Sequence, residues 1–218
     1  MITVKTKWEI EKMRLAGRAA AAARRAAGEA IEPGVTTAHI DAVVARTLRE
    51  HGATASFYKY HGYPASVCVS INDEVIHGIP GARVICEGDI VKIDVGAIIS
   101  GYHGDTADTF TVGRVPEKTR RLIDITRRSF FEGMKMARAG NRISDISSAI
   151  GGFAEKNGFS VVRMFTGHGI GTNLHEDPEV PNFGYPGRGP RLIPGMTIAV
   201  EPMINEGGFE VSIMPDGW

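Results

Sequence analysis

The sequence lacks a net charge, because 25 lysines and arginines balance 25 aspartates and glutamates among 218 residues. Proteins whose main partner is nucleic acid usually carry a basic excess, so no nucleic-acid partner is predicted. Cysteine is also scarce. Cys68 and Cys86 are too few for a disulfide framework and form no metal motif, which is typical of a reducing compartment.

Long apolar runs are missing as well. No stretch approaches the about 20 apolar residues that a membrane-spanning helix needs. The opening residues, MITVKTKWEIEKMR, carry charges where a signal peptide has an apolar core. These absences predict a cytoplasmic globular protein with no membrane partner. The basic cluster Arg18, Arg24 and Arg25 lies on one expected helix and is interpreted as a solvated face.

The order of expected elements repeats once along the chain. Helices over 7–30 and about 36–51 precede strands over 66–71, 89–98 and 106–112. After Pro116, helices over 117–140 and 143–158 precede strands over 159–165 and 195–204. This order predicts an α+β fold, a single domain over 1–218 made of half-repeats of about 1–115 and 116–218.

Each half places a histidine before an acid-bearing apolar strand. The first half has His77, then Asp94 and Asp105, and the second has His168 and Glu201. Duplicated α+β halves usually form a site at their shared interface. We therefore expect these residues to mark the functional site.

Asp94 and Asp105 stand in a predicted β-hairpin. If Ser100-Gly101 is a two-residue loop, Asp94 faces Ala107, and Asp105 lies diagonally across on the same face. A loop one residue pair earlier would place the two aspartates directly opposite each other. In both registers the carboxylates share a face, and like charges so close need a proton or a cation between them. The alternatives are that each aspartate pairs with an arginine or faces water.

Glu201 and His168 are ambiguous when taken singly. Glu201 interrupts TIAVEPMI, where a solvent-facing glutamate is as common as a ligand, and a loop histidine such as His168 is more often a surface residue. Taken together, three carboxylates and one imidazole would suit manganese, iron, cobalt or zinc. Two such ions sharing a carboxylate can activate a water and polarise a carbonyl.

Four segments together resemble the type I methionine aminopeptidases of bacterial kind: YHGYPASVCVSINDEVIHGIP, KIDVGAIISGYHGDTADTF, TGHGIGTNLHEDPEVPN and GMTIAVEPMI. The resemblance runs from about Lys5 to Trp218. It implies the pita-bread (creatinase/aminopeptidase-like) fold, with a pseudo-two-fold duplication. It also implies metal-dependent removal of the initiator methionine from nascent proteins with a small second residue, with the ribosome as the place of encounter.

The resemblance also assigns residues to roles. It implies that Asp94, Asp105, His168 and Glu201 bind two divalent ions, with Asp105 bridging them and Glu201 also relaying a proton. His77 and His175 match histidines that contact substrate near the scissile bond and steady developing charge. The methionine side chain would enter a pocket made by Tyr60, Tyr63, Cys68 and Trp218. Without the resemblance, structural histidines and core aromatics would be the safer interpretations.

The chain departs from the family pattern in two places. Leu174 stands where close relatives often have an aromatic residue. Family members also continue for about thirty residues beyond the match to Trp218, and that tail carries a fifth ligand, a glutamate bridging both ions. The site is therefore expected to be C-terminally incomplete. Two other functions stay open: a proline-specific aminopeptidase of the same fold, and a catalytically impaired module that binds peptides or proteins.

Overall fold

The structure is a computed structural model that describes all 218 residues, and the chain divides into two compact units. The hairpin unit comprises Lys7–Pro116, Gly171–Leu174 and Ile213–Trp218. The split-sheet unit comprises Met1–Thr6, Glu117–Ile170 and His175–Ser212. The main division falls between Pro116 and Glu117, near the expected half-repeat boundary. The origin of the halves by duplication stays a prediction.

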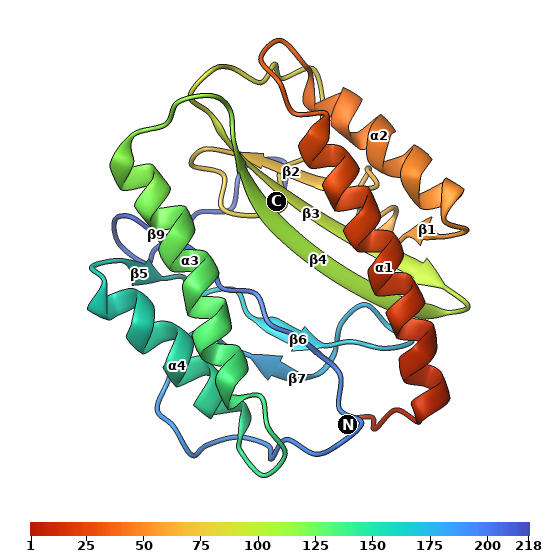
Figure 1. Cartoon of the computed structure of the whole chain (residues 1–218), viewed down its shortest axis with the longest axis vertical. Coiled ribbons are helices and arrows are strands. Elements are labelled where there is room, and N and C mark those ends of the chain that lie inside the picture. The colour runs from red at the N-terminus through yellow and green to blue at the C-terminus, as the bar shows by residue number, and fades with distance from the viewer. The chain divides into compact units, whose positions relative to one another are not determined.

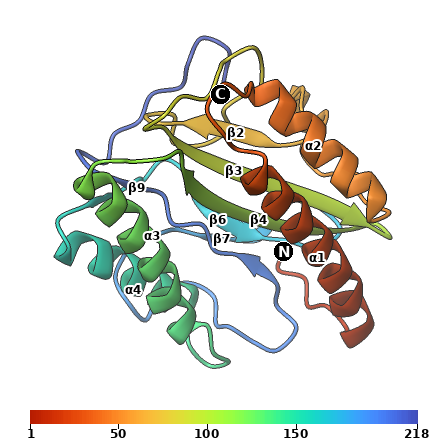
Figure 2. The ribbon, with the colours of Figure 1, turned by 45° about the horizontal axis from the view of Figure 1, so that its top comes forward.

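The hairpin unit holds two helices, one short 3₁₀ turn and four strands. They are α1 (Lys7–Glu29), α2 (Thr37–Glu50), the turn Tyr60–Gly62, β1 (Thr54–Ala55), β2 (Cys68–Ile71), β3 (Ile90–Ile99) and β4 (Tyr102–Thr111). β3 is the centre of the sheet. β1 and β2 pair with different parts of it, and β4 pairs antiparallel along its whole length. Figures 1 and 2 show α1 and α2 side by side over one face of this sheet.

Small side chains let α1 approach the sheet closely. Its buried positions are all alanines, Ala16, Ala19, Ala20, Ala23 and Ala27. At the nearest point, a Cβ added to Gly104 of β4 would lie 2.3 Å from the backbone nitrogen of Gly17. Backbone therefore meets backbone there, and no larger residue fits without displacing the helix.

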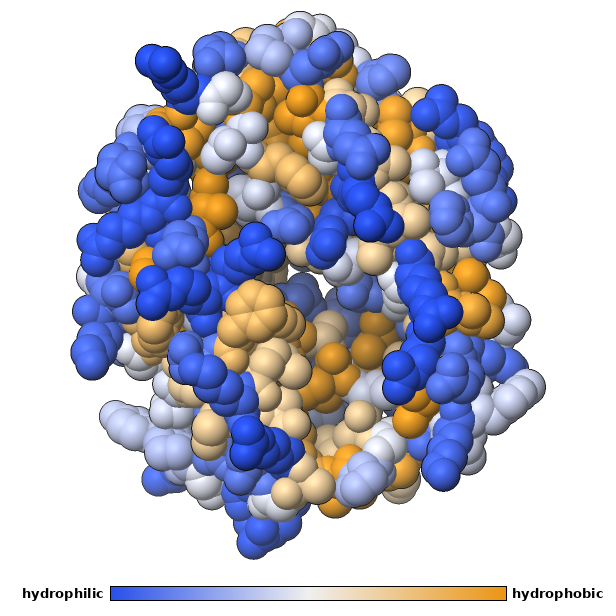
Figure 3. All heavy atoms as spheres, in the orientation of Figure 1, coloured by the Kyte–Doolittle hydropathy of each residue, from blue (hydrophilic) through white to orange (hydrophobic).

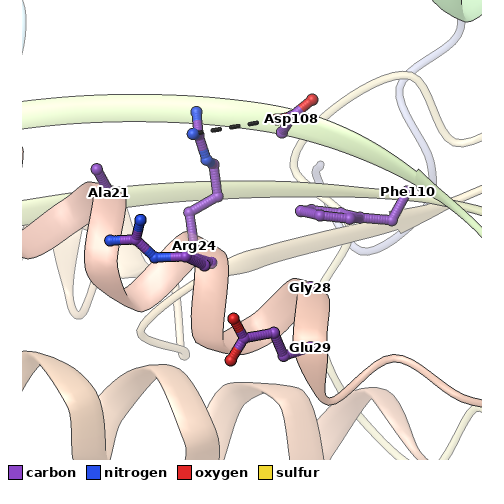
Figure 4. A pocket seen from close by; sticks show the side chains of 7 residues that line it. Ala21, Arg24, Gly28, Glu29, Asp108 and Phe110 are labelled. Atoms are coloured by element: carbon purple, nitrogen blue, oxygen red, sulfur yellow. Dashed lines mark ion pairs between the residues drawn. The ribbon is translucent and has the colours of Figure 1, made fainter.

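Arg18 and Arg25 of the basic cluster are exposed, as the interpretation as a solvated face predicts, but Arg24 corrects it. Its guanidinium donates to Thr106 Oγ1 at 2.6 Å and to the Ala107 carbonyl at 3.1 Å. Asp108 lies 4.0 Å from the same group, and Figure 4 shows Arg24 directed toward it from α1. The sequence pattern missed this contact because its partners lie on a strand far along the chain. The arginine ties α1 to β4.

The split-sheet unit contains two helices and two small sheets. They are α3 (Glu117–Met136), α4 (Ile143–Lys156), β5 (Ser160–Val161), β6 (Gly167–Gly169), β7 (Glu176–Val180), β8 (Ile198–Ala199) and β9 (Ile204–Asn205). β6 lies between β7 and β8, and β5 pairs with β9. The exposed positions of α3 are largely charged, and Figure 3 shows blue side chains over its upper part and apolar ones lower down, where Figure 1 draws this helix. Phe131 and Met134 are its exposed apolar residues.

Several expected elements of this unit are shorter than the sequence pattern predicts. α3 ends at Met136 rather than Gly140, because the Asn141 side-chain amide donates to the Met136 carbonyl and the Gly140 amide bonds to Leu192. The strand expected over 159–165 pairs only at Ser160–Val161. An apolar sequence pattern does not indicate at which residue a strand stops pairing with its neighbour.

The strand expected over 195–204 is wrong in its middle. Pairing stops after Ala199 and resumes at Ile204, so Glu201 stands between two short strands. Pro202 has no N–H to offer a neighbouring strand, and the Glu201 carbonyl accepts a 2.6 Å hydrogen bond from the Asn182 side chain instead. Across the whole chain, no helix is long and apolar enough to cross a membrane.

Candidate metal and substrate site

The hairpin turns at the predicted residues. Ser100 and Gly101 both have positive φ, 51° and 78°, as the tightest hairpin turns require. Asp94 pairs with Ala107, and Asp105 pairs with Gly96. The two aspartates therefore lie diagonally on one face of the sheet, as the two-residue loop predicts, and the alternative register does not occur.

The face that carries the aspartates is the one turned away from α1. Along β4 side chains alternate, so Asp105 points to the face opposite Gly104 and Asp108, which lie toward α1. Both aspartates are half-buried. A partly desolvated pair of carboxylates on one face is a donor set suited to hard divalent cations.

The residues expected to form the methionine pocket gather beside Asp94. Cys68 on β2 is directly opposite Asp94 in the sheet register and is buried. Tyr63 is also buried, and its hydroxyl donates to the carbonyls of Val67 and Gly78 at 3.1 and 2.9 Å. Burial, followed by the nearby Cys68 and Asp94, raises the pKa of Tyr63 well above its ordinary value. The phenol therefore stays neutral, and its two hydrogen bonds hold the ring in place.

Trp218 and His77 complete this cluster. The Trp218 ring meets the Tyr63 ring edge to face at 4.9 Å between centroids, and the His77 ring at 5.7 Å. His77 has a φ of 60°, uncommon for a residue with a side chain, and such strain often occurs at functional sites. Tyr60 stands in the adjoining 3₁₀ turn, against the His61 ring, and burial raises its pKa.

Gly78 explains how His77 is held in that conformation. Its amide donates to Ser70 Oγ at 2.9 Å, and the Val69 amide donates to its carbonyl at 2.9 Å. A Cβ at Gly78 would lie 2.4 Å from the Val69 carbonyl oxygen, so the loop rests directly on β2. Only a residue without a side chain allows the loop to pack this closely against β2.

We expect Gly78→Ala to lower the melting temperature by about 2–10 °C, because the added methyl group must push the loop off β2. The matched control is Gly81→Ala in the same loop, where a Cβ would meet nothing within 4 Å. Calorimetric melting of both variants measures the difference. Equal stability of the two variants would contradict the seating described here.

His168 and Glu201 meet in the split-sheet unit. His168 Nε2 lies 3.2 Å from Glu201 Oε1, and the imidazole is buried. His168 Nδ1 lies 2.8 Å from the Gly169 carbonyl oxygen, which can only accept a hydrogen bond. Nδ1 therefore carries a proton, and Nε2 faces Glu201 with a lone pair when the imidazole is neutral.

That arrangement has an electrostatic consequence. In the neutral imidazole this lone pair faces a carboxylate oxygen, and Glu201 Oε1 is buried without a hydrogen-bond partner. Two acceptors held this close repel each other unless a proton or a cation lies between them. An imidazole whose other nitrogen is fixed by a carbonyl is the usual form of a metal-binding histidine, so the donor set fits a divalent ion.

The glycines on either side of His168 allow neighbouring strands to pack closely against β6. A Cβ at Gly167 would lie 2.4 Å from the Ala199 carbonyl oxygen of β8, and one at Gly169 would lie 2.1 Å from the Asp177 carbonyl oxygen of β7. β6 is thus squeezed between its two neighbours, with a register irregularity after His168. These two glycines therefore allow the backbones of the neighbouring strands to approach β6 closely.

His175 lies against His168. Their ring centroids are 4.1 Å apart and the planes meet at 72°. His175 is itself exposed, directly before the first residue of β7. An exposed imidazole beside the expected ligand His168 is able to reach a bound substrate.

Sequence reasoning missed two supporting residues. Asn182 is fully buried and holds the Glu201 carbonyl. Asp41 accepts a hydrogen bond from the Ser66 amide at 2.8 Å, which fixes the loop between Tyr63 and Cys68. Burial, the largest cause, raises the pKa of Asp41, and the amide bonds of Ser66 and Val67 oppose this. Asp41 lies in no motif, and Asn182 ends one of the four quoted segments. The sequence does not show what either side chain contacts, because each partner is distant along the chain.

Comparison with known proteins places this geometry in a family. Residues 11–217 match the model of metallopeptidase family M24. The chain is 49% identical over 218 residues to a methionine aminopeptidase of Clostridium perfringens, covering all of this chain and 88% of that protein. It is similar to the crystal structure of methionine aminopeptidase from Thermotoga maritima, with a TM-score of 0.98, 43% identity, and coverage of 100% and 88% of the two chains.

A more distant likeness is to a prolidase from Pyrococcus furiosus. The TM-score is 0.79 and the identity 26%, with coverage of 94% of this chain and 59% of that one. The expected α+β pita-bread fold is thereby confirmed. The high identity to named methionine aminopeptidases does not favour the proline-specific alternative or the binding module. The chain belongs to metallopeptidase family M24 and, within it, to the methionine aminopeptidases.

Proposed function

We propose that this chain removes the N-terminal methionine from peptide chains whose second residue is small. We further propose that two divalent ions assist it, held by Asp94, Asp105, His168 and Glu201. The observation that supports metal binding best is the 3.2 Å separation between His168 Nε2 and the buried Glu201 Oε1, with His168 Nδ1 already held by a carbonyl. Newly made proteins are the natural source of N-terminal methionine, so the substrate is expected at the ribosome.

The bound metal would supply Lewis-acid activation of water and of the scissile carbonyl. The chain's own residues do the rest. Asp94 and Asp105 present two carboxylates from one rigid hairpin face, so their spacing is set by the sheet register. Glu201 Oε1 can take the proton of the attacking water and pass it to the departing amine, as a general base and then a general acid.

The two histidines are proposed to act on the substrate rather than on the metal. His175 is exposed beside His168, in reach of a group bound there. His77 lies beside Trp218 at the pocket, held by the strained backbone described above. A donor fixed before the reaction lowers the cost of the charge that develops on the tetrahedral oxygen.

Substrate choice would follow from the pocket. Tyr63, Cys68 and Trp218 form an apolar cluster with its polar phenol already bonded to backbone carbonyls. A flexible thioether can fill such a space, whereas a charged side chain would lose its hydration without gaining a partner. Tyr60 is proposed to line the same pocket from the adjoining turn.

We expect the purified chain, stripped of metal and reloaded with Mn²⁺ or Co²⁺, to release methionine from Met-Ala-Ser. It should leave Met-Lys-Ser and Leu-Ala-Ser at least about 100-fold less cleaved. Leucine does not fit the proposed methionine pocket, lysine is not a small second residue, and a misfit loses binding in the transition state. Mass spectrometry of the products measures this. Metal-independent cleavage, or equal cleavage of Leu-Ala-Ser, would contradict the proposal, and tight binding of Met-Ala-Ser without turnover would favour the binding module.

A further inference from the structure

We propose that a buried ion pair between Lys5 and Glu176 positions His175 for its action on the substrate. This inference rests on the proposed function, in which His175 contacts the scissile bond. Lys5 and Glu176 touch no substrate in that scheme, so they are positioning residues. Their effect would reach the reaction only through the chain next to them.

The pair is distinguished by its burial. Lys5 Nζ lies 2.6 Å from Glu176 Oε2, and the two side chains are only 5% and 8% exposed. The lysine–glutamate pair of α3, Lys135 and Glu132, has a similar separation of 2.7 Å but is 62% and 36% exposed. Removing charges from water costs free energy, so a buried pair persists only in a geometry in which the two groups bind each other. An exposed pair can replace its partner by water.

Further contacts fix the same carboxylate. Thr3 Oγ1 donates to Glu176 Oε2 at 2.6 Å, and Lys5 Nζ donates to Thr3 Oγ1 at 2.5 Å. The Met1 amino group pairs with the Asp177 carboxylate. Met1, Thr3 and Lys5 therefore hold the segment Glu176–Asp177 at the start of β7. We call these contacts the N-terminal clasp.

The clasp is anchored at its other side by backbone. The Lys5 amide donates to the Gly195 carbonyl at 2.8 Å. A Cβ at Gly195 would lie 2.7 Å from Val4 Cγ1 and 2.8 Å from the Lys5 carbonyl oxygen, so this segment is tightly seated. Lys5 thus cannot shift without moving the loop that leads into β8.

The clasp is proposed to restrict the position of His175. It immediately precedes Glu176, whose own partner in the sheet is Gly169 of β6. Fixing both the backbone and the carboxylate of Glu176 leaves little freedom to the residue before it. The His175 ring is thereby held against His168 on an otherwise exposed turn. An error of about 1 Å at such a group can cost roughly 100-fold in rate.

The test uses four variants of the whole chain. Lys5→Met removes the ammonium and keeps most of the stem, and Lys5→Arg keeps the charge. The double variant Lys5→Met/Glu176→Met removes both charges, which is often neutral for stability. Lys135→Met is the matched control, because it breaks an exposed pair of the same chemistry far from His175 in sequence.

Four quantities are measured for each variant: the melting temperature, kcat and KM on Met-Ala-Ser, and amide hydrogen exchange over residues 174–178. We expect Lys5→Met to lower kcat about 10- to 100-fold with KM changed less than about 3-fold, and to speed exchange in that segment at least about 10-fold. Lys5→Arg should stay within about 3-fold of the parent, and Lys135→Met within about 2-fold.

The double variant separates positioning from simple stabilisation. It should regain most of the melting temperature while kcat stays low and exchange stays fast. If it regains both stability and kcat, the pair is only structural and the proposal is overturned. Unchanged exchange in Lys5→Met would overturn it too. If the parent chain cleaves no peptide, the proposed function fails on its own, and the exchange of Lys5→Met still decides whether the clasp orders this segment.

Discussion

Asp105→Asn should weaken Mn²⁺ binding at least about 100-fold, because the loss of a ligand should exceed the 10- to 100-fold cost of losing an outer-shell partner. The substitution keeps the size of the side chain and removes its charge. Asp94→Asn should weaken binding less, since by resemblance Asp105 bridges two ions and Asp94 does not. Titration calorimetry of metal-free protein measures both effects.

The chain offers a matched control for this experiment. Asp108 lies on the same strand, but it points to the opposite face and pairs with Arg24. Asp108→Asn removes the same charge from β4 without touching the aspartate face, so its Mn²⁺ affinity should stay within about 3-fold of the parent, as expected for an exposed pair. Equal affinity of the Asp105 and Asp108 variants would exclude Asp105 as a ligand.

His175→Ala should lower kcat by about two to four orders of magnitude and leave the metal content unchanged, because the imidazole is proposed to act on transition-state charge. Steady-state kinetics on Met-Ala-Ser and elemental analysis of the same sample measure the two quantities. His39→Ala provides the control, since His39 is an exposed histidine on α2.

Two results would count against this role of His175. Full activity in His175→Ala would show that the imidazole has no part in turnover. A parallel loss of metal would show that it supports the ligand His168, which it contacts. Only a loss of kcat at constant metal content agrees with the proposal.

The hairpin was predictable because its constraints are local. Ser100-Gly101 sets a two-residue turn, and the turn fixes the partner of every residue on β3 and β4. The face shared by Asp94 and Asp105 follows from that register alone. The start of α2 was predicted only as about residue 36, and the structure shows Thr36 capping it by accepting from the His39 amide.

The features that the sequence could not predict depend on distant partners. Asn182 and Pro202 together end the pairing around Glu201, and an apolar pattern records neither effect. Lys5 and Glu176 are ordinary charged residues in the sequence, and only the fold buries them together. The roles of the histidines came from family resemblance, because a histidine alone does not reveal what it touches.

The close contact between α1 and β4 has a consequence for biosynthesis. The alanine stripe of α1 has little apolar surface of its own, and its partner Gly104 leaves the ribosome long after Gly17. Until β4 is made, α1 can pack only against α2 and the earlier strands, and it lacks its backbone-to-backbone contact with Gly104. The helices and strands of Lys7–Pro116 should therefore complete their packing late in the synthesis of that segment, once β4 has emerged.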